Sequence, residues 1–282
     1  MIADAKDFIT PHITDSHTLD YPCFHTGFVC EYELPRWNPI HIGNFTLDIS
    51  PTRHVVMLWV AALLCLLFTL LALRGHNRRT REGKAPSGVG NGFEAIILYL
   101  RNEIILPNVG PHGNAFVPYL LTVFFFVLFA NLLGLVPYGA TATGNISVTA
   151  SLAIVSFIVI EVAGMRALGK GYINTIVFWP HDMSLGMKMF ISPILTPIEI
   201  IGKLTKPFAL AIRLFANMIS GHVVLLALIS LIFTFATWIL VPLPIAMALA
   251  ISGLEIFVGF LQAFIFMLLT SVFIGLIRES AH

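Results

Sequence analysis

Charged residues are scarce in this sequence. Only 11% of its 282 residues are Asp, Glu, Lys or Arg, whereas 57% are hydrophobic and 23 are Phe. A soluble globular domain carries about 25% charged residues, so most of this chain lacks a polar surface to present to water. The composition argues against a soluble enzyme, a nucleic-acid-binding protein and a disordered scaffold. It predicts a membrane protein with several spanning helices.

Cysteine is also rare, with three in the chain, which is too few for a disulfide framework. Cys23 and Cys30 lie in a polar N-terminal tail, residues 1–52, and Cys65 lies in an apolar run. A Cys23–Cys30 disulfide in an oxidising exterior and two independent thiols both fit the sequence. His25 between them does not complete a ligand set of the zinc type. We therefore expect no bound metal and no cofactor.

Long runs with few or no charges have the length of membrane-spanning helices. Two prolines at residues 241–244 separate the last two runs, because prolines this close together break a helix. The sequence therefore predicts an all-α integral membrane protein, with a membrane domain over residues 53–282 and two unusually long final helices. The five expected spans cover about residues 55–73, 115–137, 148–165, 189–240 and 245–277.

Basic residues are absent from the turns at 138–147 and 241–244, whereas residues 74–84 contain five of them. Lys and Arg accumulate in cytoplasmic loops. We therefore expect the loop at 74–84 and the C-terminus, with Arg278, to lie on the cytoplasmic side. The N-terminal tail is then outside.

A shorter helix is expected at about residues 92–106, between the first two spans. Its apolar residues recur at helical spacing. A helix lying on the inner membrane surface and a helix packed against a neighbouring chain both fit this pattern. The residues that carry the pattern are Phe93, Ile96, Ile97, Leu100 and Ile104.

Only two formal charges interrupt residues 207–277, namely Arg213 and Glu255. Placing Arg at membrane depth costs roughly 2.5 kcal/mol or more, and its guanidinium cannot escape by losing a proton. Glu255 and His222 can both titrate near neutral pH once they are partly desolvated. A fixed cation together with two titratable groups is typical of a proton path.

Helical geometry sorts these polar residues into faces. At 100° per residue, Arg213 shares a polar stripe with four other residues of its helix. Glu255 and Gln262 are seven residues apart and share a face of the last helix. His222 lies on the side of its helix opposite Arg213. Its side chain is expected to point toward the face of the last helix that carries Glu255 and Gln262. The other stripe residues are Glu199, Lys206, Asn217 and Ser220.

Structural explanations compete with this interpretation. Arg213 as a permanent counter-ion of Glu255 also fits the sequence, and so does His222 as a hydrogen-bonded packing residue. Glu199 lies near the expected inner interface, where a charged side chain can extend to water. Glu161, close to Arg166, is expected to form an interfacial ion pair with it.

Residues 206–222, KPFALAIRLFANMISGH, resemble the signature of subunit a of F-type ATP synthases, P-x-x-L-x-x-R-L-x-x-N-M-x-x-G-H/E. Glu255 and Gln262 are similar to the family's acid or His followed seven residues later by Gln. Residues 131–137, NLLGLVP, resemble its Asn-Leu-x-x-L-x-Pro segment. The resemblance covers about residues 50–282.

The resemblance implies a stator subunit of the membrane sector, Fo, that conducts protons and performs no catalytic chemistry itself. Arg213 matches the essential arginine that faces a carboxylate of the rotor ring. The resemblance assigns an inner half-channel to Glu199, although Ala209 stands where some members carry a hydroxyl. The residues that match an outer half-channel are His222, Glu255, Asn217, Gln262 and Asn131.

The implied partners are a rotor ring of c subunits, peripheral-stalk b subunits and the lipid bilayer, and no nucleic acid. The transported ion is H+, with Na+ not excluded. The implied location is a bacterial plasma membrane rather than an organellar one, with the last two helices as a tilted hairpin.

Two alternatives stay open. One is a proton-coupled transporter whose Arg213 binds an anionic substrate, against which stands the absence of an internal repeat. The other is a purely structural membrane anchor.

Overall fold

A computed structural model shows a predominantly helical chain that divides into two compact units. The first unit comprises Met1–Arg74, Phe125–Val148 and Leu214–Ala263, and the second comprises Gly75–Phe124, Thr149–Arg213 and Phe264–His282. Cys23 and His25 lie outside the described residues. The structure describes residues 14–21, 30–42, 45–48, 50–81, 89–111, 113–136, 139–176, 185–235 and 241–279.

The N-terminal segment of the first unit contains short strands, which the sequence analysis did not anticipate. They form two antiparallel pairs, β1 with β2 and β3 with β4. Cys30, at the start of β2, is disulfide-bonded, whereas Cys65 is free. The strands are β1 (Thr18–Tyr21), β2 (Cys30–Glu33), β3 (Ile40–Ile42) and β4 (Phe45–Leu47).

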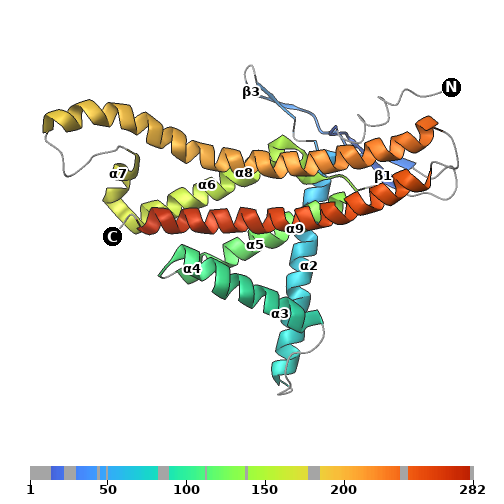
Figure 1. The fold of residues 1–282 in the computed structure, drawn as a ribbon, viewed down its shortest axis with the longest axis horizontal. Coiled ribbons are helices and arrows are strands. Elements are labelled where there is room, and N and C mark those ends of the chain that lie inside the picture. Colours follow the sequence, from blue (N-terminus) through green and yellow to red (C-terminus); the bar gives the residue numbers. More distant parts are fainter. Residues whose placement is uncertain are drawn as a thin grey trace. The chain divides into compact units, whose positions relative to one another are not determined.

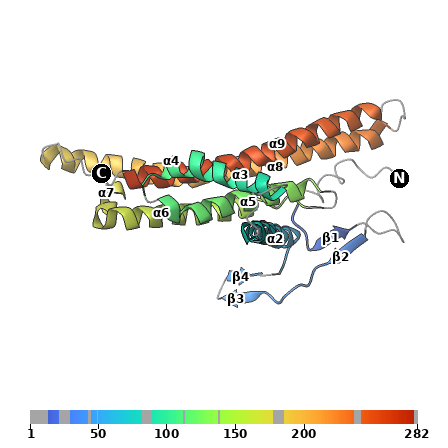
Figure 2. The same cartoon turned by 90° about the horizontal axis from the view of Figure 1, so that it is seen from below.

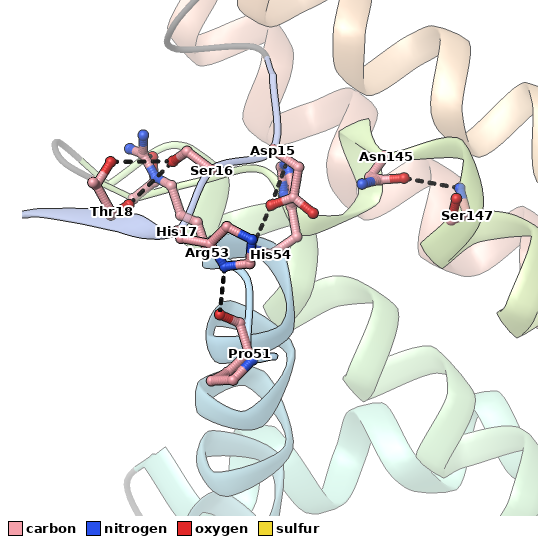
Figure 3. A network of polar contacts seen from close by, with 10 residues as sticks. Asp15, Ser16, His17, Thr18, Pro51, Arg53, His54, Asn145 and Ser147 are labelled. Carbon is pink, nitrogen blue, oxygen red and sulfur yellow. Dashed lines mark hydrogen bonds and ion pairs between the residues drawn. The ribbon is translucent and has the colours of Figure 1, made fainter. Parts of the chain in front are cut away.

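Helix α2 (Arg53–Arg81) begins where this segment docks. The backbone N–H of Arg53 donates to the carbonyl of Ser16 at 2.9 Å, and that of His54 donates to Asp15 Oδ1 at 3.4 Å. Asp15 Oδ1 also lies 3.8 Å from His54 Nε2, and His17 Nδ1 lies 3.4 Å from the carbonyl oxygen of Pro51 (Figure 3). These contacts satisfy N–H groups that a helix start leaves unpaired, and they place a carboxylate at the positive end of the helix.

The remaining helices of the first unit are parts of longer ones, α5 (Val117–Gly134), α8 (Leu185–Phe235) and α9 (Pro242–Glu279). In this unit the last part of α8 lies antiparallel beside the first part of α9, and α2 runs across their direction (Figures 1 and 2). Phe68 of α2 packs on Phe129 of α5, with ring centroids 5.5 Å apart.

The second unit is also helical. Its helix over residues 89–109 includes a π-helical stretch in the middle, and it covers the segment that the sequence analysis expected at 92–106. Its elements besides its parts of α5, α8 and α9 are α3 (Val89–Tyr99), the π-helix Leu100–Ile105, α4 (Leu106–Val109), α6 (Ile146–Leu168) and α7 (Ile173–Ile176). Three prolines lie inside α8 without ending it.

The end of α9 is held closely in the second unit. Arg278 donates to the carbonyl of Val109 at 2.9 Å and to that of Pro111, and its guanidinium lies over the ring of Phe116. Gly110 between them has φ +79°, a left-handed backbone that glycine adopts without strain. The cationic side chain thus satisfies carbonyls at the C-terminus of α4.

Glu161 of α6 pairs with Lys203 of α8 rather than with Arg166, which corrects the expectation from the sequence. The Lys203 Nζ lies 3.7 Å from Glu161 Oε2, donates to Thr175 Oγ1 at 3.0 Å and lies over the ring of Tyr172. Proximity along the chain favoured Arg166, but tertiary packing brings Lys203 to the carboxylate.

Among the described residues, five helices are long and apolar enough to cross a membrane. Their surfaces are rich in exposed large apolar side chains, such as Leu63 and Leu66 of α2 and Leu249 of α9. Side chains of this kind suit contact with lipid rather than with water. The chain is therefore an all-α integral membrane protein, as the sequence predicts. The five stretches are Arg53–Leu71, Gly113–Gly134, Ile146–Leu168, Phe190–Ile232 and Pro242–Arg278.

Candidate functional site

The candidate site is built on one face of α9 in the first unit. Glu255, Gly259 and Gln262 recur there at spacings of four and three residues, which places them on the same side of the helix. All three are buried, and the exposed fraction is 5% for Glu255 and 1% for Gln262. A carboxyl group and an amide are thus enclosed within an otherwise apolar helical segment.

Helix α8 meets this face with one polar and one small residue. Asn217 Nδ2 donates to Gln262 Oε1 at 3.0 Å. One turn further along α8, Gly221 lies against Glu255, where a Cβ atom would come within 3.0 Å of Glu255 Oε1. A Cβ atom there would force the carboxyl group to move by a few tenths of an ångström. The pairing of 217 with 262 and of 221 with 255 is what two antiparallel helices produce.

Helix α5 meets the same face between the two pairs. Asn131 Nδ2 donates to the carbonyl oxygen of Gly259 at 3.0 Å, and Asn131 Oδ1 accepts a hydrogen bond from the Thr143 hydroxyl at 2.7 Å. A Cβ atom on Gly259 would lie 3.3 Å from the Asn131 Cβ. The absence of a side chain at Gly259 therefore allows α5 to approach α9. We call Asn131, Thr143, Asn217, Glu255 and Gln262 the polar cluster.

Two atoms of the polar cluster keep unused hydrogen-bonding capacity. Glu255 Oε2 and Gln262 Nε2 are buried and have no hydrogen-bond partner among the described residues. Buried polar atoms without a partner are costly, so they are uncommon where a side chain serves packing alone. A carboxyl oxygen in this state can take up and release a proton, and the Gln262 amide keeps an N–H group that can donate a hydrogen bond.

Arg213 lies on α8 one turn before Asn217. Its side chain is exposed, and no hydrogen bond or ion pair joins it to any of the residues that the structure describes. All five residues of the predicted stripe on α8 are exposed. In the second unit, Lys206 lies over the ring of Phe273 at 5.0 Å. The stripe therefore remains open to contact with another chain.

The structure brings four of the seven predicted site residues into one cluster. His222 is half-buried on α8 directly after Gly221. Glu199 and Arg213 belong to the second unit, and both are exposed. The four clustered residues are Asn131, Asn217, Glu255 and Gln262.

Thr143 is the cluster residue that the sequence analysis missed. It lies in the short connection before α6 and carries no charge, so nothing in its local pattern distinguishes it from an ordinary turn residue. The structure alone shows that residues 140–143, small and hydroxyl residues in a connection expected to face water, are buried.

The fold and the polar cluster together define an integral membrane protein that holds a carboxyl group and amides between its helices. The sequence profile described as "ATP synthase A chain" matches residues 55–275. This match spans well over half of the chain, so the chain belongs to the ATP synthase A chain family.

Curated relatives support the same assignment. "ATP synthase subunit a" of Chloroherpeton thalassium is 44% identical over 266 residues, which cover 94% of this chain and 74% of the relative. "ATP synthase subunit a 2" of Prosthecochloris aestuarii is 45% identical over 281 residues, covering 99% and 80%. "ATP synthase subunit a" of Pelodictyon phaeoclathratiforme is 45% identical over 281 residues, covering 99% and 77%.

Proposed function

We propose that this chain is the stator subunit that conducts protons in the membrane sector of an ATP synthase. It performs no covalent chemistry and couples proton flow to rotation of a neighbouring ring of c subunits, while peripheral-stalk b subunits hold it in place. The observation that carries the proposal is Arg213, an exposed cation on a membrane helix with no partner among the described residues. A charge in that position calls for an anionic group on another chain.

The role of Arg213 follows from electrostatics. A guanidinium beside a ring carboxylate favours its ionised form, because opposite charges stabilise each other. The carboxylate therefore gives up its proton as it reaches Arg213 and cannot carry that proton past it. Desolvation of both groups limits their attraction, so the pair separates again as the ring turns. Arg213 thus keeps two access paths apart without blocking rotation.

The outer access path runs through the polar cluster. Glu255 is the proton-carrying group, with an oxygen that has no hydrogen-bond partner among the described residues. Asn217, Gln262 and Asn131 line the path with amides, and His222 on the adjoining turn is a second titratable group. The hydrogen bond from Asn131 to Gly259 and the one from Asn217 to Gln262 both lie within one unit of the structure.

We assign the inner access path to the part of α8 that precedes Arg213. Glu199 lies fourteen residues before Arg213 in the sequence, about 21 Å along a helix, and His222 lies nine residues after it, about 13 Å. The two titratable groups are therefore offset on either side of the arginine. This offset is what two half-channels opening on opposite membrane faces require.

The lengths of α8 and α9 favour an inclined hairpin. Fifty-one residues in α8 extend about 77 Å at 1.5 Å per residue, whereas the hydrocarbon core of a bilayer is about 30 Å thick. A helix of this length lies within the membrane only if it is strongly tilted. A strongly tilted helix can lie alongside several subunits of the neighbouring ring.

The proposed orientation places the N-terminal segment outside a bacterial plasma membrane and the C-terminus in the cytoplasm. The basic residues of 74–84 support it. The disulfide at Cys30 is a second and independent argument, because disulfides persist in oxidising compartments. H+ is the proposed ion, because the path contains two groups that can take up and release a proton, Glu255 and His222.

The proposal is tested in the complete ATP synthase reconstituted in liposomes. Arg213→Ala should abolish proton-driven ATP synthesis in complexes that contain every subunit, because the ring carboxylate then carries its proton past the stator. Arg166→Ala removes an arginine that is also exposed but lies near the end of the apolar stretch Ile146–Leu168, and it should leave synthesis within about twofold of wild type. Synthesis retained by assembled Arg213→Ala complexes would overturn the proposal.

A further inference from the structure

The connection between α5 and α6 contributes a side chain to the polar cluster that has no role in the path described above. Thr143 is fully buried, and its hydroxyl donates to Asn131 Oδ1 at 2.7 Å. Asn131 is 2% exposed and donates from Nδ2 to the carbonyl oxygen of Gly259. The hydroxyl therefore connects this loop, α5 and α9 through one carboxamide.

The Gly259 carbonyl fixes which way that carboxamide points, and the Thr143 hydroxyl completes the arrangement. A backbone carbonyl can only accept a hydrogen bond, so Asn131 must present its NH₂ group to Gly259. Its oxygen then points toward Thr143, whose hydroxyl is able to donate. Without this donor, the buried amide oxygen would lose its partner, and the hydrogen bond to Gly259 would be held less firmly.

The hydrogen bond from Asn131 to the Gly259 carbonyl meets α9 at a critical position. Gly259 lies one turn after Glu255 and three residues before Gln262, on the same buried face. A shift of α9 at Gly259 would move both side chains relative to their α8 partners, Gly221 and Asn217. The helices approach so closely here that a Cβ atom on Gly221 would lie 3.0 Å from Glu255 Oε1, so a small displacement changes the space around the carboxyl group.

The loop itself is well held, as a positioning role requires. Arg53 of α2 donates from Nη2 to the carbonyl of Gly139 at 3.5 Å. Thr141 packs against Gly134, where a Cβ atom would come within 2.8 Å of the Thr141 Cβ. Ala140, Thr141 and Ala142 are all buried. Thr143 is thus presented from a segment anchored to both α2 and α5.

We propose that Thr143 is a positioning residue of the outer proton path. Its hydroxyl holds Asn131 in the orientation that the Gly259 carbonyl requires, and Asn131 positions the Glu255–Gln262 face of α9 against α8. This inference rests on the proposed function, since it concerns how Glu255 and Gln262 are placed for proton transfer. It assigns Thr143 no contact with the proton itself.

The test compares variants in the complete, reconstituted ATP synthase, with rates expressed per assembled complex. Thr143→Val keeps the shape but removes the donor, and it should lower proton-driven ATP synthesis about tenfold. Thr143→Ser keeps the donor and should restore most of the rate. Thr270→Val is the matched control, because Thr270 is equally buried but donates only within its own helix, to Phe266. It should stay near wild type.

Coupling to Asn131 gives the second measurement. If both residues act through one carboxamide, Asn131→Ala combined with Thr143→Val should be no slower than Asn131→Ala alone. If Thr143→Val does not assemble, Thr143→Ala is measured in its place with the same expectations. Thr143→Val or Thr143→Ala complexes that work at the wild-type rate, or losses that multiply in the double variant, overturn the inference.

The result is separable from that for the proposed function. Synthesis that disappears in Arg213→Ala but stays unchanged in Thr143→Val leaves the stator function intact and rejects only the positioning role. Synthesis retained in Arg213→Ala rejects the stator function itself.

Discussion

Single atoms decide the geometry of the polar cluster. The two glycines that face it, Gly221 on α8 and Gly259 on α9, each stand where a side chain of the neighbouring helix needs space. A helical glycine costs about 1 kcal/mol relative to alanine, so each close approach comes at some expense of helix stability.

Gly221→Ala should therefore impair proton conduction more than it affects folding. The added Cβ would lie 3.0–3.3 Å from Oε1, Cδ and Cγ of Glu255, so the carboxyl group must move by a few tenths of an ångström. We expect a severalfold loss of passive proton flux through the membrane sector, since small displacements of a reacting group have large effects on transfer. Dye-monitored flux in liposomes measures this.

Gly202→Ala is the control for this change. It lies on the same helix, and a Cβ atom there would meet nothing within 4 Å. It should leave the proton flux unchanged. Equal losses in the two variants would show that the effect of Gly221→Ala comes from the helix backbone rather than from Glu255.

Part of the cluster was predictable from the sequence at this scale. The seven-residue spacing of Glu255 and Gln262 was enough to place them on one face, because helical periodicity relates residues of the same helix. The same arithmetic cannot identify partners on another helix. It did not identify Gly221 as the α8 residue that meets the Glu255 carboxyl group.

At the scale of elements, the second unit shows how a helix end is fixed by backbone contact. Near its C-terminus, α9 passes so close to the 108–111 turn that Gly275 meets the carbonyl of Asn108. Arg278, one turn later, caps the carbonyls of Val109 and Pro111. Backbone atoms cannot rotate away as a flexible side chain can, so this contact tolerates little added volume.

Gly275→Ala should accordingly destabilise the protein by about 1–3 kcal/mol, the usual cost of overpacking. A Cβ atom at this position collides with the Asn108 carbonyl oxygen, which requires the helix or the turn to shift. The temperature at which the purified protein loses helical circular dichroism should fall. Gly253→Ala, on the same helix but in open space, should leave it unchanged or raise it. A stable Gly275→Ala variant would contradict the described packing.

The elements were predicted more completely than their contacts. Apolar runs of bilayer length indicated five spanning helices, and the structure has five helices of this kind among the described residues. The predicted ion-pair partner of Glu161 was wrong. Sequence proximity favoured Arg166, whereas packing brings Lys203 of α8 to the Glu161 carboxylate. The four short strands near the N-terminus were missed, since three or four residues carry too little periodicity to detect.

For the whole molecule, orientation in the membrane is a prediction that labelling can check. Asn38 and Arg166 are both exposed, and the proposed topology places them on opposite sides of the membrane. A membrane-impermeant maleimide should modify Asn38→Cys in intact cells and Arg166→Cys only in inverted vesicles. The wild-type chain provides the background from its own cysteines. The reverse pattern of labelling would contradict the orientation.

The amino-acid sequence by itself determined the class of protein, the number of spanning helices and the isolation of Arg213 and Glu255 in apolar surroundings. These follow from composition and periodicity, which are properties of the chain read locally. Only the tertiary structure decided that Asn217 meets Gln262, that Gly221 makes room for Glu255 and that Thr143 donates to Asn131. Such pairings depend on how helices distant in the sequence pack against one another, and no local pattern encodes them.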